Sequence, residues 1–182
     1  MEKRAMNNDT HWKTYCAVVL LMAAACCSVY FLLKSDREKV AQKTVQKHMI
    51  ATSVSPDSLR IMYYAPIDSA FGTNYFSDRD RDTLQANITK VAQILKKGAD
   101  RMGPDGMPNF YIIDLAQRQM AGTARLGSIV VHDTPKGVFS GFKTHVNYEG
   151  YHPVNGKFRA QRWYYLTKDC KSVVTTFELP LP

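Results

Sequence analysis

An uncharged stretch near the N-terminus, Tyr15 to Leu33, constrains this chain of 182 residues more than any other feature. It holds nineteen residues, YCAVVLLMAAACCSVYFLL, between Lys13 and Lys34. A helix rises about 1.5 Å per residue, so this stretch would be roughly 28 Å long, close to the ~30 Å hydrocarbon core of a bilayer. Trp12 and Tyr30 lie near its ends, where amphipathic rings favour the membrane interface. The stretch predicts one transmembrane helix.

Two other interpretations of the same stretch stay open. A cleaved signal peptide has an apolar region of about 7–15 residues followed by a small-x-small site. This stretch is longer and ends in the bulky residues 29–33. A lipoprotein would carry its lipid on Cys26, after three alanines, but the residues that follow Cys26 remain apolar. An uncleaved anchor fits the length best.

The basic residues that flank the stretch bear on which side of the membrane the rest of the chain lies. Basic residues prefer the cytoplasmic side, and the N-terminal flank holds three of them against five in residues 34–50. Counted alone, these charges place the C-terminal domain inside. A short N-terminal tail before a first span often stays inside as a signal-anchor, so our prediction is an extracytoplasmic domain.

Charge and cysteine content narrow the class of protein further. The formal net charge is +8, and the excess lies in residues 34–50 and 136–182 instead of being spread along the chain. A uniformly basic nucleic-acid binder would look different. The composition, 45% apolar and 22% charged, is that of a globular protein. Three of the four cysteines fall inside the apolar stretch, so no disulfide is expected within the domain.

The segment after the apolar stretch is predicted to continue as a helical stalk. Val40, Ala41, Thr44, Val45 and His48 form one stripe at helical spacing. The stripe either packs on the chain's own domain or forms the seam of a parallel dimer. Small and polar residues with a proline then indicate a linker. The predicted organisation is a tail (1–14), a transmembrane helix (15–33), a stalk with linker (34–57) and an α+β domain (58–182).

The first half of that domain shows one strand and one strong helix. Residues 59–65 are rich in aromatic and β-branched side chains, which favours a strand. Ser77 and Asp80 have the spacing of a capping box, and an apolar stripe starts at Leu84, so a helix is predicted to begin here. Weaker patterns predict a second helix and a short strand, at 114–126 and 129–131.

The last third of the chain predicts an antiparallel β-meander. Three segments alternate apolar and polar residues, and turn-forming residues join them. The expected fold is a single α+β domain in which this curved sheet packs one apolar face on one or two helices and leaves the other face in water. As an analogy in architecture, carried by no motif, this plan is similar to cystatin-like folds. The three strands are expected at 138–149, 157–167 and 172–179.

No residue pattern predicts catalysis, a cofactor or a metal. Asp78, Asp80 and Asp82 match the start of a calcium loop, but the glycine and glutamate that the loop requires are missing. His132, His145 and His152 lack compact metal-ligand spacing. Cys170 and the serine of GVFSG are interpreted as structural residues. We therefore expect a protein that is not an enzyme.

One strand offers a candidate interaction face. Alternation places a cationic and aromatic set on the side of the strand opposite Phe158 and Tyr164, which are expected in the core. A water-exposed face with these side chains suits a protein or ligand contact. The members of this face are Arg159, Gln161, Trp163 and Tyr165.

These features favour a single-pass membrane protein whose domain is a non-catalytic binding or assembly module. Its expected partners are the lipid bilayer and another protein or a second copy of the chain. One alternative is a membrane-tethered enzyme with a pocket between helix and sheet, using groups such as Asp114, His132 or Tyr148. Another is a membrane-proximal nucleic-acid binder, which the charge distribution disfavours.

Overall fold

The computed structural model describes residues 3–99, 110–130, 136–153 and 156–182, with the backbone alone for residues 3–14, 17, 23–33, 99 and 130. The described fold is α+β and its sheet is antiparallel, as the sequence predicts. The helices are α1 (Lys3–Thr52), the short 3-10 helix η1 (Pro56–Ser58), α2 (Asp78–Ala99) and α3 (Phe110–Val130). The strands are β1 (Arg60–Tyr64), β2 (Asp68–Ala70), β3 (Gly141–His152), β4 (Gly156–Leu166) and β5 (Val173–Pro180).

The chain divides into two compact units, Met1–Lys39 and Val40–Pro182. In the first unit, the side chains of residues 18–22 are between 49% and 71% exposed. Of the helical segments whose side chains are described, none combines the length and the apolar character that crossing a bilayer requires. The predicted span at 15–33 falls largely outside that described set, which leaves out the side chains of residues 17 and 23–33.

The sheet of the second unit is built around the predicted meander. Its strand order is β1-β3-β4-β5, and β2 pairs with the beginning of β3 beside β1. The strand predicted at 59–65 is confirmed as β1, whereas β2 was not predicted. The register of β4 and β5 shifts between Tyr165 and Leu166. Because of this shift Val173 packs against one core, whereas Phe177 and Leu179 belong to the other.

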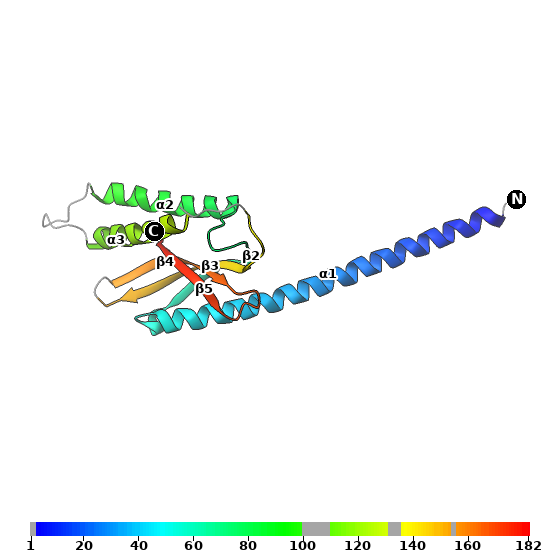
Figure 1. Ribbon diagram of the computed structural model, residues 1–182, viewed down its shortest axis with the longest axis horizontal. Helices are drawn as coiled ribbons and strands as arrows, with labels where there is room; N and C mark the ends of the chain where they lie inside the picture. The colour runs from blue at the N-terminus through cyan, green and yellow to red at the C-terminus, as the bar shows by residue number, and fades with distance from the viewer. Residues whose placement is uncertain (1–2, 100–109, 131–135, 154–155) are drawn as a thin grey trace. The chain divides into compact units, whose positions relative to one another are not determined.

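The second half of the predicted stalk covers one face of this sheet. Ala41, Val45 and Met49 of α1 are at most 2% exposed and share a core with Tyr148 and Tyr164 of the sheet. Figure 1 shows this cyan part of α1 lying along the sheet. The stalk therefore packs on its own domain, and the alternative of a dimer seam is wrong because the same stripe is already covered.

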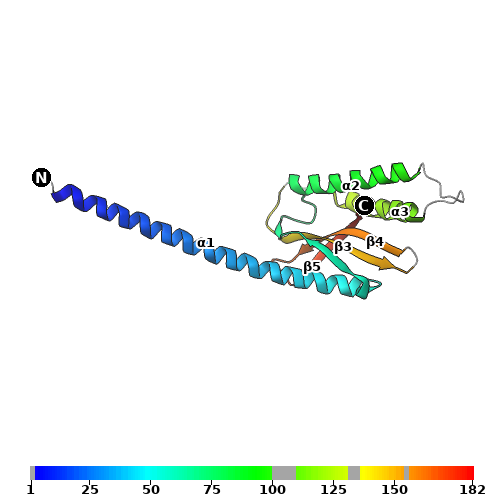
Figure 2. The ribbon, with the colours of Figure 1, turned by 180° about the vertical axis from the view of Figure 1, so that it is seen from behind.

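The two helices α2 and α3 cover the opposite face. Leu84 of α2 and Leu126 of α3 form a second core with Trp163 and Phe177. Both views of the ribbon show these helices on the side of the sheet opposite residues 40–52 of α1 (Figures 1 and 2). The sheet is thus the middle layer of three, and the expectation that one of its faces is in water is wrong. Helices on both faces bury both sets of alternating side chains.

The observed ends of α2 and α3 can be compared with the ends that the sequence predicts. The predicted capping box is confirmed, since the backbone N–H and the hydroxyl of Ser77 donate to an Asp80 carboxylate oxygen over 2.8 and 2.6 Å. Helix α3 starts before and ends after the predicted 114–126. Ile129 and Val130 lie in this helix and not in the predicted short strand; the third residue of that strand, Val131, falls outside the described residues.

Gly122 sets how closely α3 approaches β5. A Cβ atom at this position would lie 2.5 Å from the carbonyl oxygen of Glu178 and 2.9 Å from Leu179 Cδ2. We expect Gly122→Ala to lower the free energy of unfolding by about 1–3 kcal/mol, because the helix must move away from the strand. Urea denaturation measures this change.

The matched control is Gly127→Ala on the same helix, where a Cβ would meet no atom within 4 Å. Because alanine has the higher helix propensity, this variant should gain up to about 1 kcal/mol. Equal effects of the two substitutions would contradict the close approach of α3 to β5.

Candidate functional site

The residues of the predicted interaction face do not form an exposed patch. Trp163 and Tyr165 are each 2% exposed and Gln161 is 4% exposed, because α2 and α3 cover them. Trp163 donates its indole N–H to Gln161 Oε1 at 3.1 Å and stacks on Phe177 with ring centroids 5.9 Å apart. Arg159 alone is exposed, and its Nε lies 2.8 Å from Glu149 Oε1. The prediction of an exposed interaction face on this strand is therefore wrong.

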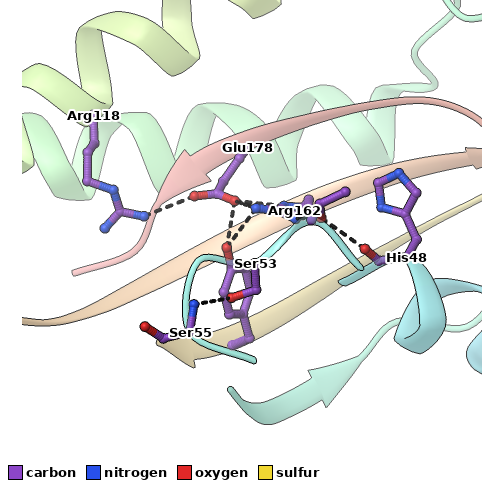
Figure 3. Close-up of polar contacts among 8 residues, drawn as sticks. His48, Ser53, Ser55, Arg118, Arg162 and Glu178 are labelled. Carbon is purple, nitrogen blue, oxygen red and sulfur yellow. Dashed lines mark hydrogen bonds and ion pairs between the residues drawn. The ribbon is translucent and has the colours of Figure 1, made fainter. Parts of the chain in front are cut away.

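The structure instead assembles a charged cluster from four elements, and we call it the arginine cluster. It consists of Arg118 on α3, Tyr148 on β3, Arg162 on β4 and Glu178 on β5. Glu178 lies between the two guanidinium groups (Figure 3). Its Oε1 accepts from Arg118 at 3.0 Å, and its Oε2 accepts from Arg162 Nε at 2.7 Å and from the Tyr148 hydroxyl at 2.6 Å.

Tyr148 acts in this cluster as a hydrogen-bond donor. Burial raises the pKa of its phenol well above the ordinary value of 10, and the Glu178 carboxylate raises this pKa further. The hydroxyl therefore keeps its proton at neutral pH. Both oxygens of Glu178 accept hydrogen bonds, from Arg118 on one side and from Arg162 and Tyr148 on the other. These contacts hold both guanidinium groups next to one carboxylate.

Two neighbouring pockets open beside the cluster, and we call them the paired pockets. Their volumes are about 450 and 440 Å³, and they share Asp114, Arg118, Tyr151 and Phe158 in their walls. Across the described part of the chain, these walls contain five basic side chains and three carboxylates. The basic ones are Arg60, Arg118, Lys157, Arg159 and Arg162.

Sequence reasoning missed this site, although one signal was present. Alternation along β4 places Arg162 on the same face as Phe158 and Tyr164, so a charged residue stood in a row of expected core residues. Arg162 is paired with Glu178 in the register of β4 and β5, which a sequence-based hairpin alignment could have found. Arg118 contacts Glu178 from a helix that is 60 residues away in sequence, and no local sequence pattern indicates this contact.

The structure shows what contacts are made by several of the acidic and histidine residues that the sequence analysis considered as metal ligands. Asp80 forms a buried ion pair with Lys143 of β3 in addition to capping α2. His145 stacks on Trp163, and His152 lines one of the paired pockets, whereas His132 falls outside the described residues. Within the parts of the chain that the structure describes, no three His, Cys, Asp or Glu side chains gather closely enough to hold a metal ion.

The burial of His145 predicts that the stability of the fold depends on pH. Burial lowers its pKa below the ordinary value of 6.5; Asp80 opposes this shift and Arg79 adds to it. The unfolded chain therefore binds a proton at a higher pH than the folded chain does. We expect the thermal midpoint to be constant above about pH 6.5 and to fall as the pH is lowered toward 5.5.

The test measures thermal midpoints between pH 7.5 and 5.5 for the parent chain and for His145→Phe, which keeps a ring against Trp163. The variant should show a smaller fall. His48, whose pKa is lowered by burial and by Arg162, is expected to contribute in the same direction, so some fall should remain in the variant. A variant with the full pH dependence of the parent would contradict the assignment to His145.

Comparisons with known proteins add no family or relative to this description. The chain matches no protein-family model, and neither a curated relative nor a similar solved structure is found for it.

Proposed function

We propose that this chain is a single-pass membrane protein whose α+β domain is a non-catalytic binding module on the extracytoplasmic side. The observation that carries the binding role is the lining of the paired pockets. The walls contain five basic side chains and three acidic ones, with the rings of Tyr151 and Phe158 beside them. This concave surface therefore favours ligands that are negatively charged and partly apolar. Concave sites with a few placed polar groups are the usual place for ligand and partner contacts.

The membrane anchor rests on different support. The nineteen residues from Tyr15 to Leu33 carry no charge and have the length of a bilayer core. The side chains of residues 18–22 are largely exposed, and contiguous exposed apolar surface is typical of membrane or protein contacts. The helix α1 extends from this stretch to Thr52, so it provides both the anchor and a layer of the domain.

A specific observation also favours the enzyme alternative. Asp114 and Tyr148, two of the groups expected in such an enzyme, both line the pocket of about 440 Å³. The third, His132, falls outside the described residues. The binding role is preferred because the Tyr148 hydroxyl is buried, already donates to Glu178 and has a raised pKa, which makes it a poor proton donor to a substrate.

In-cell photo-crosslinking tests the proposal. Benzoylphenylalanine replaces Tyr151, which is 47% exposed in the wall shared by the paired pockets, or Lys90, which is exposed on α2. We expect a discrete adduct with another protein or a second copy from position 151 and none from position 90. A reporter fused to the C-terminus tests the side of the membrane.

The opposite results would count against the proposal. Equal labelling at both positions, or no adduct at position 151 together with a monomeric protein in detergent, would reject a binding module at this site. Turnover of a substrate that requires Asp114 would favour the enzyme alternative.

A further inference from the structure

We propose that the paired pockets bind an acidic peptide segment of a partner protein, with Arg118 as the residue that receives its carboxylate. This inference rests on the proposed binding function and adds the chemical class of the partner. It is carried by the unused donors of Arg118, by the excess of positive charge around it, and by the aromatic walls of the same pockets.

The guanidinium group of Arg118 has N–H donors that its contacts among the described residues do not use. A guanidinium group offers five N–H donors in a planar fork that suits a carboxylate. Among the contacts of the described residues, one nitrogen of Arg118 donates to Glu178, and the guanidinium carbon lies 4.1 Å from the centre of the Phe158 ring. Stacking on this ring holds the group in place at the wall shared by the paired pockets, so its remaining donors can meet a ligand without much loss of side-chain freedom.

The charges around Arg118 favour an anion. Glu178 is shared by Arg118 and Arg162, so one carboxylate faces two guanidinium groups. Glu149 forms an ion pair with Arg159. With these carboxylates occupied, the side chains of the walls, five basic and three acidic, have an excess of two positive charges.

The aromatic content of the walls favours a peptide over a small inorganic anion. Tyr151 is 47% exposed and Tyr111 is 50% exposed, and both line the pocket of about 450 Å³. Together with the partly buried Phe158 they offer apolar surface next to the positive charges. A segment that alternates acidic and apolar side chains would use both kinds of surface, whereas phosphate would use the charges alone.

Fluorescence anisotropy tests this with the full chain in detergent micelles. The probe is a fluorescein-labelled octapeptide of six glutamates and two phenylalanines, compared with the same peptide carrying glutamines. We expect the glutamate peptide to bind, with an affinity that falls as salt is added. Arg118→Gln should weaken this binding about tenfold, because it removes a charge-assisted hydrogen bond.

Arg125→Gln is the matched control, since it makes the same change at an exposed position two turns further along α3, outside both pockets. It should leave the affinity unchanged. If Arg118→Gln lowers the thermal midpoint strongly, Lys157→Gln, at an exposed position in a pocket wall, replaces it as the test.

Several outcomes would overturn the inference. The first is equal binding of the glutamate and glutamine peptides, and the second is equal affinity of the Arg118 and Arg125 variants for the glutamate peptide. The third is that inorganic phosphate or phosphatidylglycerol vesicles displace the labelled peptide as effectively as unlabelled peptide does. The last would assign the site to phosphate or to a lipid headgroup. Crosslinking at position 151 without glutamate-peptide binding would keep the proposed function and reject an acidic partner.

Discussion

Trp163→Ala is expected to lower the free energy of unfolding by about 3–5 kcal/mol, a large part of the roughly 5–15 kcal/mol that a domain of ordinary stability has. The indole is 2% exposed, stacks on Phe177 and lies 4.7 Å from the His145 ring between centroids. Its removal leaves a cavity under α2 and α3 and deprives Gln161 Oε1 of its donor. Urea denaturation followed by circular dichroism measures the loss.

The size of this effect distinguishes the observed fold from the one expected for an exposed interaction strand. Trp163→Phe should recover much of the stability because it refills most of the cavity. Phe110→Ala is the exposed aromatic control, since Phe110 is 76% exposed and its removal should cost about 0.5 kcal/mol or less. Similar losses for Trp163→Ala and Phe110→Ala would mean that the tryptophan is on a water-exposed face after all.

The second large effect concerns the proposed anchor. We expect the parent chain to remain in the membrane pellet after alkaline carbonate extraction and the double variant Leu21→Arg/Met22→Arg to move to the supernatant. Both positions lie close to the middle of the uncharged stretch, where one arginine costs about 2.5–3.5 kcal/mol of insertion free energy. Two arginines would cancel most of the gain from the surrounding apolar residues.

Gln42→Arg/Gln46→Arg is the control for added charge. It places the same two arginines on the exposed side of α1 in the second unit, outside the stretch. This variant should stay in the pellet. Recovery of the unaltered parent chain in the supernatant would reject the anchor, and with it the membrane placement of the binding module, while the fold of residues 40–182 would be unaffected.

The local elements of the domain could be predicted because each is determined by neighbours in sequence. Period-two alternation and turn residues located β3, β4 and β5 to within a few residues. The Ser77–Asp80 spacing located the start of α2. The prediction of a short strand at 129–131 was wrong because β-branched residues alone do not distinguish a strand from the end of a buried helix, and Ile129 packs in the second core.

The sequence by itself determined which residues share a face of a strand and which form a stripe on a helix, since these follow from the backbone periods. Only the tertiary structure decided what covers each face: residues 40–52 of α1 on one side, and α2 with α3 on the other. It also brought Arg118 to Glu178, 60 residues apart in the chain. The physical reason is that periodicity is a property of neighbouring residues, whereas burial and ion pairing depend on how segments distant in sequence pack together.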